Sequence, residues 1–195
     1  MSPYTFALFV HVSGVIGMFV GLGVWLFGVA MLRRAERVEQ VRLVVGPVLA
    51  SGNLVVGSIL VLAAGGIYMA VTAWADARPA WILVATASFL LLAPVGAFVL
   101  DPRLRAIARL ARATPDGLLL DSNALAMRTP DPVLGMRLRM FVAVLLGIVF
   151  LMTTKPPLVW ATITMGAVLV LGLVSSAPEW WRMRARTLST TYIRK

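Results

Sequence analysis

The sequence predicts an all-α membrane protein, a bundle of five transmembrane helices, from its composition, its apolar runs and its charge pattern. The chain has 195 residues, of which 60% are hydrophobic and 13% are charged. A soluble domain is closer to about one half apolar and about one quarter charged. Uncharged runs of about 20 residues, long enough to cross a bilayer, recur along the chain. A single membrane domain, residues 1–195, accounts for this length.

Charged or proline-containing connections bound the expected spans. The spans cover about residues 4–32, 47–74, 81–100, 133–154 and 158–177. Pro47 is expected in the first turn of the second span, because proline is tolerated at that position of a helix.

The distribution of basic residues predicts the orientation of the bundle. Of the 18 Lys and Arg residues, all but Arg78 and Lys155 fall on one side of the five spans, either in connections and tails or, for Arg137 and Arg139, near the start of the fourth span. Because basic residues accumulate on the cytoplasmic side, we expect the N-terminus outside and the C-terminus inside. Residues 101–132 then form a cytoplasmic loop, and 182–195 form a basic cytoplasmic tail. The net charge of +10 follows from this topology, so no nucleic-acid partner is expected.

A short amphipathic helix is predicted directly after the third span. Asp101 and Pro102 are typical of a helix N-terminus. Apolar and basic positions then separate at helical spacing: Leu104, Ile107, Leu110 and Ala111 against Arg105, Arg109 and Arg112. This pattern predicts an interfacial helix on an anionic inner leaflet.

The first span carries a face on which large and small residues alternate. Steps of three and four residues place these positions on one side of a helix: His11, Gly14, Met18, Gly21, Trp25, Gly28 and Leu32. Small residues mark close helix contacts in lipid. The residues expected to pack the first span against the second are Gly14, Gly17, Gly21, Gly57 and Gly65. A homodimer seam is the alternative role for them.

Polar groups inside the spans are few. All eight acidic residues lie outside the apolar runs, whereas ion-coupled carriers and pumps usually keep carboxylates in the membrane. Asn53 is the main polar candidate, either for an interhelical hydrogen bond or for a permeation path. The chain has no cysteine, which excludes disulfides and thiolate metal sites.

His11 is the only histidine and the only ionisable side chain well inside a span. One interpretation is structural, with a neutral ring bonded to a backbone carbonyl or a serine. Another is a cofactor or metal site, because imidazole with the thioethers of Met18, Met69 and Met165 suits Cu(I) or haem iron. A third is contact with a proton or a substrate. A haem held by two histidines would require a second chain, and we expect no cofactor.

Two short motifs resemble a known family. Phe9-Val10-His11-Val12-Ser13-Gly14 is similar to the opening Leu-His-x-x-Gly helix of a bacterial family of predicted integral membrane proteins of unknown function. Ala64-Gly65-Gly66-Ile67-Tyr68 resembles the Thr-Gly-x-Tyr element that ends the second helix of that family. The resemblance covers about the first 110 residues. More distantly, both motifs resemble the CopD-like membrane domain, which would imply copper or haem at His11.

The sequence therefore predicts a multi-pass, non-enzymatic protein of the bacterial plasma (inner) membrane. It contains no nucleotide-binding loop, catalytic triad or His-Glu-x-x-His motif, so no catalytic residues are expected. The favoured role is an accessory or assembly subunit, or a small transport or stress protein. The alternatives are a haem b or copper protein with His11 as ligand, and a passive facilitator for small solutes. Expected partners are the anionic inner leaflet and a homodimer or larger membrane complex.

Overall fold

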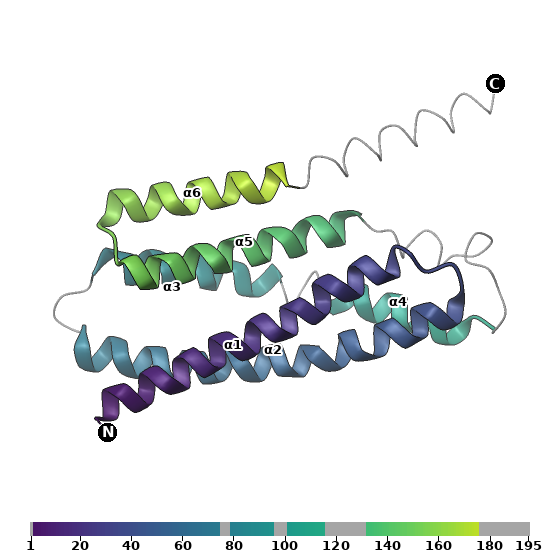
Figure 1. Ribbon diagram of the computed structural model, residues 1–195, viewed down its shortest axis with the longest axis horizontal. Helices are drawn as coiled ribbons and strands as arrows, with labels where there is room; N and C mark the ends of the chain where they lie inside the picture. The colour runs from purple at the N-terminus through teal and green to yellow at the C-terminus, as the bar shows by residue number, and fades with distance from the viewer. Residues whose placement is uncertain (1, 75–78, 96–100, 116–131, 176–195) are drawn as a thin grey trace.

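The computed structural model describes residues 2–74, 79–95, 101–115 and 132–175, and every element within these ranges is a helix. The predicted basic tail 182–195 and residues 116–131 of the predicted loop lie outside them. The all-α class is confirmed (Figure 1). The helices are α1 (Pro3–Leu32), α2 (Val38–Ala73), α3 (Ala80–Val95), α4 (Asp101–Ala113), α5 (Pro132–Thr154) and α6 (Leu158–Val174).

Two groups of helices make up the molecule. The antiparallel pair α1 and α2 forms one group, and α4 packs beside the start of α2. The second group is α3, α5 and α6, in which α5 lies between α3 and α6 (Figure 1). Contacts between α1 and α5 join the groups. The helices α1, α2, α3, α5 and α6 alternate in direction, so each of them carries the chain to the opposite end of the bundle (Figure 1).

Three helices are long and apolar enough to cross a membrane: Pro3–Leu32, Val38–Ala73 and Leu134–Thr154. The apolar parts of α3 and α6, Ala80–Leu92 and Leu158–Val174, are shorter. A helix of 17 residues is about 26 Å long, against a hydrocarbon core of about 30 Å. Length alone therefore establishes three candidate spans.

The start of α2 differs from the prediction by about nine residues, because capping decides it. The Gln40 side-chain oxygen accepts hydrogen bonds from the backbone N–H groups of Glu36 at 2.8 Å and Arg37 at 3.3 Å. These bonds satisfy donors at the helix N-terminus, so α2 begins at Val38. Pro47 consequently lies inside the helix rather than in its first turn, where its ring leaves the Leu43 carbonyl without the usual helical donor.

The helix α4 forms as predicted, but the expected contact of its apolar side with lipid is wrong. Leu104, Ile107 and Ala111 are no more than 2% exposed, because this side packs into the protein against α2. The Arg42 side chain of α2 also donates to carbonyls at the end of α4, to Ala111 at 2.6 Å and to Thr114. The helix is thus fastened to the bundle, and its Arg105, Arg109 and Arg112 side chains are exposed.

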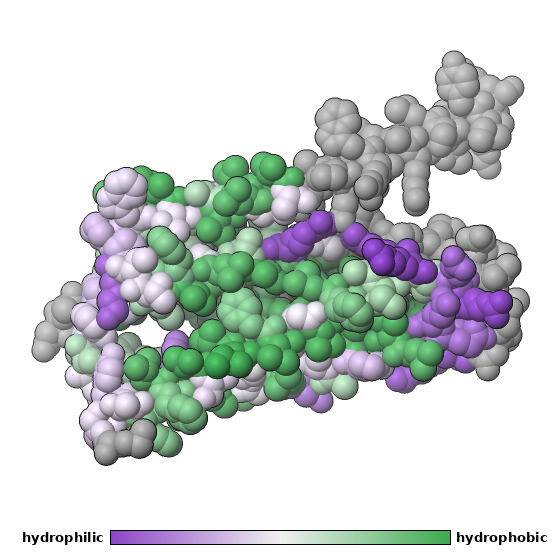
Figure 2. Space-filling view, viewed as in Figure 1, coloured by the Kyte–Doolittle hydropathy of each residue, from purple (hydrophilic) through white to green (hydrophobic). Residues whose placement is uncertain are grey.

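The surface separates by polarity along the helix axes. Figure 2 shows apolar side chains over the middle of the molecule and the most hydrophilic ones at the end with the α1–α2 turn and α4. Large apolar side chains such as Phe27, Leu43 and Leu91 are 69 to 78% exposed. A lateral surface of this kind is typical of a protein whose solvent is lipid.

Candidate functional site

The buried face of α1 is the one that the spacing of three and four predicts. His11, Gly14, Met18, Gly21, Trp25, Gly28 and Leu32 are all buried. This face lies along α2 and forms the α1–α2 seam, which we define by these residues and by their contacts on α2. The seam holds the only histidine of the chain and is therefore the candidate functional site.

Glycines allow the two backbones of the seam to meet. A Cβ added at Gly14 would lie 2.5 Å from the Leu62 nitrogen and 2.8 Å from the Ser58 carbonyl oxygen. On α2, a Cβ added at Gly65 would lie 2.6 Å from the Ala7 carbonyl oxygen. Both clashes are with backbone, which cannot move aside as a side chain can.

Gly17 and Gly21 face side chains of α2. A Cβ at Gly21 would lie 2.5 Å from a methyl group of Val55, and one at Gly17 would meet the Ser58 hydroxyl. The structure does not place Gly57 in the seam, contrary to the sequence prediction, because a Cβ there would meet no atom within 4 Å. The seam positions of α2 follow Ser51, Val55, Ser58 and Leu62, and Gly57 lies about 100° away from Ser58 around the helix.

His11 is 8% exposed, and its Nδ1 lies 2.6 Å from the Leu62 carbonyl oxygen. Because a carbonyl only accepts, Nδ1–H is the donor, and the tautomer that this bond selects has the lone pair on Nε2. Gly66 makes room for the ring, since a Cβ there would lie 3.1 Å from Nδ1. Among the described residues, Nε2 has no hydrogen-bond partner.

A second bond of the same kind lies further along the seam. The Trp25 Nε1–H donates to the Val48 carbonyl oxygen at 3.0 Å. His11 and Trp25 are 14 residues apart on α1, and their acceptors Leu62 and Val48 are 14 residues apart on α2. The two bonds therefore fix one antiparallel register.

Two of the three methionines proposed as further ligands, Met18 and Met165, do not lie with His11. Met18 follows His11 by seven residues, about 10 Å along α1, so both cannot bind one ion. Met165 packs its sulfur against Gly147 and lines a pocket between α3, α5 and α6. Met69 is half-buried, one turn beyond Gly65 on α2. The described residues contain no group of three or more His, Cys, Asp or Glu side chains arranged to hold a metal ion.

Asn53 lies on the outer face of α2 and is exposed. A path for a solute past Asn53 would therefore run along the outside of a single chain. The small residues Gly46, Ala50 and Gly57 share this exposed face. We define Gly46, Ala50, Asn53 and Gly57 as the α2 outer face.

Sequence reasoning missed a cluster at the end of the bundle opposite α4. Lys155, in the α5–α6 turn, places its Nζ 5.5 Å from the centre of the Trp74 ring and 5.9 Å from that of the Trp81 ring. The two rings meet edge to face, with centroids 5.7 Å apart. Trp residues near span ends were the available signal, but their pairing depends on helix packing.

No curated protein and no solved structure matches the chain. The model of the family described as "predicted integral membrane protein (DUF2269)" matches residues 5–156. The match spans the His11 and Gly65-Gly66 motifs and confirms the family resemblance, while the CopD-like likeness stays a prediction. The chain thus belongs to the DUF2269 family of predicted integral membrane proteins.

Proposed function

We propose that this protein is a non-enzymatic, multi-pass accessory or assembly subunit of the bacterial plasma membrane, with the α2 outer face as its contact surface. Asn53 carries the proposal. It follows the last charged residue of α2, Arg42, by 11 residues, or about 16 Å of helix, so it lies within the hydrocarbon. It is exposed, and it makes no hydrogen bond to another described residue.

A carboxamide exposed to lipid requires a partner. Its N–H groups and carbonyl cannot form hydrogen bonds with hydrocarbon, and an unsatisfied polar group there costs roughly several kcal/mol. Gly46, Ala50 and Gly57 flank Asn53 at helical spacing, so another backbone could approach closely. The face therefore suits a transmembrane helix of another polypeptide.

A second copy of the chain is the simplest partner. A carboxamide is both donor and acceptor, so two Asn53 side chains complement each other across a two-fold axis. A different membrane subunit is the alternative partner, and both agree with an assembly role.

The test is the oligomeric state of the purified protein in lipid nanodiscs, measured by mass photometry. Asn53→Val should shift the assembly toward monomers, because model and natural interhelical polar contacts contribute about 0.6–2 kcal/mol each. Thr72→Val is the control, since the Thr72 hydroxyl on the same helix already bonds to the Tyr68 carbonyl at 2.8 Å. If Asn53→Val and Thr72→Val leave the wild-type distribution unchanged, the α2 outer face is not a contact surface.

Five spans, with the N-terminus outside, are part of this proposal. The Arg42 bonds to Ala111 and Thr114 hold the start of α2 and the end of α4 at one end of the bundle. The Lys155 contact with Trp74 and Trp81 holds the α2–α3 and α5–α6 connections at the other. This arrangement supports α3 and α6 as crossing helices despite their length, and the arginine-rich end as cytoplasmic.

A haem or copper site at His11 is the second candidate function. One observation favours it: metal-bound histidines usually donate their second N–H to a carbonyl or carboxylate, which orients the ring and its basic nitrogen. The bond from Nδ1 to the Leu62 carbonyl has this form. The remaining ligands would have to include Met69 or a group from a second chain.

A further inference from the structure

A pocket lies between α3, α5 and α6, and the proposed function does not use it. Its volume is about 450 Å³, within the range of about 300–1,000 Å³ that is typical of ligand sites. Aliphatic, aromatic and thioether side chains form nearly all of its lining. The lining residues are Ser88, Leu91, Leu92, Arg137, Met140, Phe141, Val144, Met165 and Leu169.

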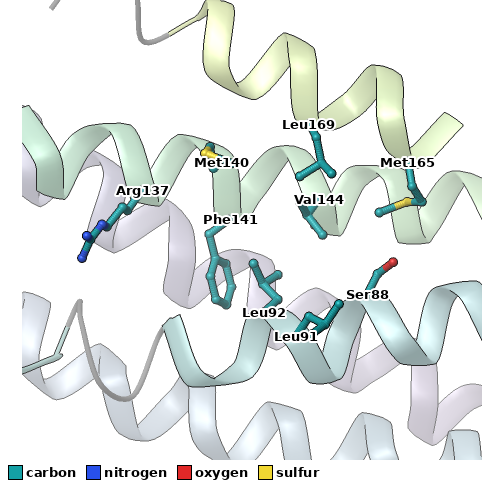
Figure 3. Close-up of a pocket in the computed structure, with 9 residues that line it drawn as sticks. All are labelled: Ser88, Leu91, Leu92, Arg137, Met140, Phe141, Val144, Met165 and Leu169. Carbon is teal, nitrogen blue, oxygen red and sulfur yellow. The ribbon is translucent and has the colours of Figure 1, made fainter. Parts of the chain in front are cut away.

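The pocket is elongated along the helices and has different ends. Figure 3 shows the Arg137 guanidinium at one end, with Ser88 and Met165 at the other. Arg137 and Val144 are seven residues apart on α5, which gives the pocket a length of at least about 10 Å. Phe141 and Leu92 face each other between the two ends.

Arg137 is the only charged residue in this lining. Its side chain is half-buried and, among the described residues, makes no hydrogen bond or ion pair. A guanidinium carries five N–H donors in a planar fork that matches the oxygens of a phosphate. A cation beside an apolar groove of a membrane protein is favourable when an anion pairs with it.

We propose that this pocket binds one anionic phospholipid of the surrounding bilayer. The phosphate pairs with Arg137, and one acyl chain lies in the groove past Phe141 and Leu92 toward Ser88. Charge complementarity identifies the occupant, because the groove offers one cation at its end and apolar walls along its length. The direction also fits, since Arg137 lies near the arginine-rich start of α5, the end at which a headgroup is expected.

The first experiment maps the lipid on the wild-type protein. The protein is reconstituted in phosphatidylcholine nanodiscs that contain a minor fraction of phosphatidylglycerol with a diazirine on one acyl chain. After illumination, peptide mass spectrometry should locate the adducts on the pocket-lining positions of α3, α5 and α6. Adducts spread evenly over the exposed apolar side chains of α1 and α2 would overturn the proposal.

The second experiment measures selectivity by native mass spectrometry of protein released from mixed nanodiscs. One phosphatidylglycerol should remain bound per chain in preference to phosphatidylcholine. Arg137→Gln should weaken this retention about tenfold, the effect of one charge-assisted contact. Arg109→Gln is the matched control, because Arg109 is an exposed arginine at the same end and does not line the pocket.

Each other outcome contradicts the proposal. Equal retention of both lipids would show a groove without headgroup recognition, and equal effects of the two Gln variants would show a general effect of charge. No retained lipid would show that the pocket does not hold a phospholipid. Arg137→Lys keeps the charge and should retain the lipid, which separates loss of binding from loss of folding. A free fatty acid that displaces the phospholipid at equal concentration would replace phosphate with carboxylate recognition and refute the assignment.

Discussion

The bond from His11 to the Leu62 carbonyl decides what the rest of the ring can do. Because Nδ1 donates, Nε2 keeps a lone pair that can accept a proton, a hydrogen bond or a metal. The same bond stabilises the α1–α2 seam. A substitution at His11 can therefore remove the structural hydrogen bond of Nδ1, the ligand nitrogen Nε2, or both. Asparagine distinguishes them, because its amide N–H takes nearly the position of Nδ1 and it has no counterpart of Nε2.

We predict that His11→Ala destabilises the protein by about 1–3 kcal/mol, because a buried contact is lost and an acceptor is left without its donor. His11→Asn should recover most of this loss. The free energy of unfolding in mixed micelles measures both effects. As a ligand test, a haem or copper protein would show a Soret band or near-stoichiometric copper that both variants abolish. Equal loss of stability in the Ala and Asn variants would contradict the structural role of Nδ1.

At the scale of single residues, the sequence predicted the side of α1 that is buried but not its partners. The spacing of His11, Gly14 and Trp25 identifies a face, because helical geometry depends only on local sequence. The acceptors Leu62 and Val48 depend on the register between two helices, which small residues permit at several offsets. Gly57 shows the same limit, since a small residue does not reveal whether its neighbour belongs to the same chain.

At the scale of helices, the seam depends on backbone contact rather than on apolar area. Hydrophobic burial drives no association between helices in lipid, so close packing and the two hydrogen bonds must hold α1 against α2. The glycines of α1 therefore differ in whether they can be replaced by a larger residue. Gly14 faces the backbone of α2, Gly21 faces a valine side chain, and a Cβ at Gly23 would meet nothing within 4 Å.

We predict that Gly14→Ala lowers the free energy of unfolding by about 1–3 kcal/mol, as overpacking against an immobile backbone does. Gly23→Ala is the matched control on the same helix. It should be neutral or stabilise by up to about 1 kcal/mol through helix propensity. Unfolding titrations of both variants in the same micelles measure the difference. Indistinguishable titration curves would show that α1 and α2 do not meet at Gly14.

Capping and tertiary contacts explain the helix predictions that were wrong. Pro47 resembles a start signal, but Gln40 satisfies donors at the helix N-terminus almost two turns earlier. The amphipathic pattern of α4 was predicted correctly, yet such a pattern does not distinguish lipid from protein as the apolar neighbour. The neighbour is decided by Arg42, whose hydrogen bonds to the Ala111 and Thr114 carbonyls hold α4 against α2. The amphipathic pattern of α4 contains no sign of these bonds.

At the scale of the whole molecule, two contacts between distant segments define opposite ends. The described arginines gather at the end where Arg42 meets α4, and Lys155 lies at the other between two tryptophans. The pocket between α3, α5 and α6 belongs to this scale as well. Its lining comes from three helices that are separate in sequence, so no local pattern could have predicted it. Charge counting needs only the order of the residues along the chain, and it predicted that most basic side chains share one end of the bundle, whereas which side of the membrane that end faces stays a prediction.

The topology prediction can be tested directly, because the chain contains no cysteine and single cysteines can be labelled one at a time. A membrane-impermeant maleimide added to whole cells should label Ser2→Cys and Thr154→Cys. Glu36→Cys, Pro115→Cys and Ser175→Cys should react only after permeabilisation. All five positions are exposed in the structure, so burial does not limit the reaction.

Each pair of neighbouring sites tests one helix or pair of helices. Glu36 and Pro115 must share a side because Arg42 bonds to the end of α4, which requires α3 to cross whenever α2 does. Thr154 and Ser175 must lie on opposite sides if the 17 residues of α6 span the bilayer. Labelling of Ser175→Cys from outside would limit the protein to four spans, because both ends of α6 would then lie on the outer side of the membrane. Labelling of Pro115→Cys from outside would separate α4 from the arginine-rich end and contradict the Arg42 contact itself.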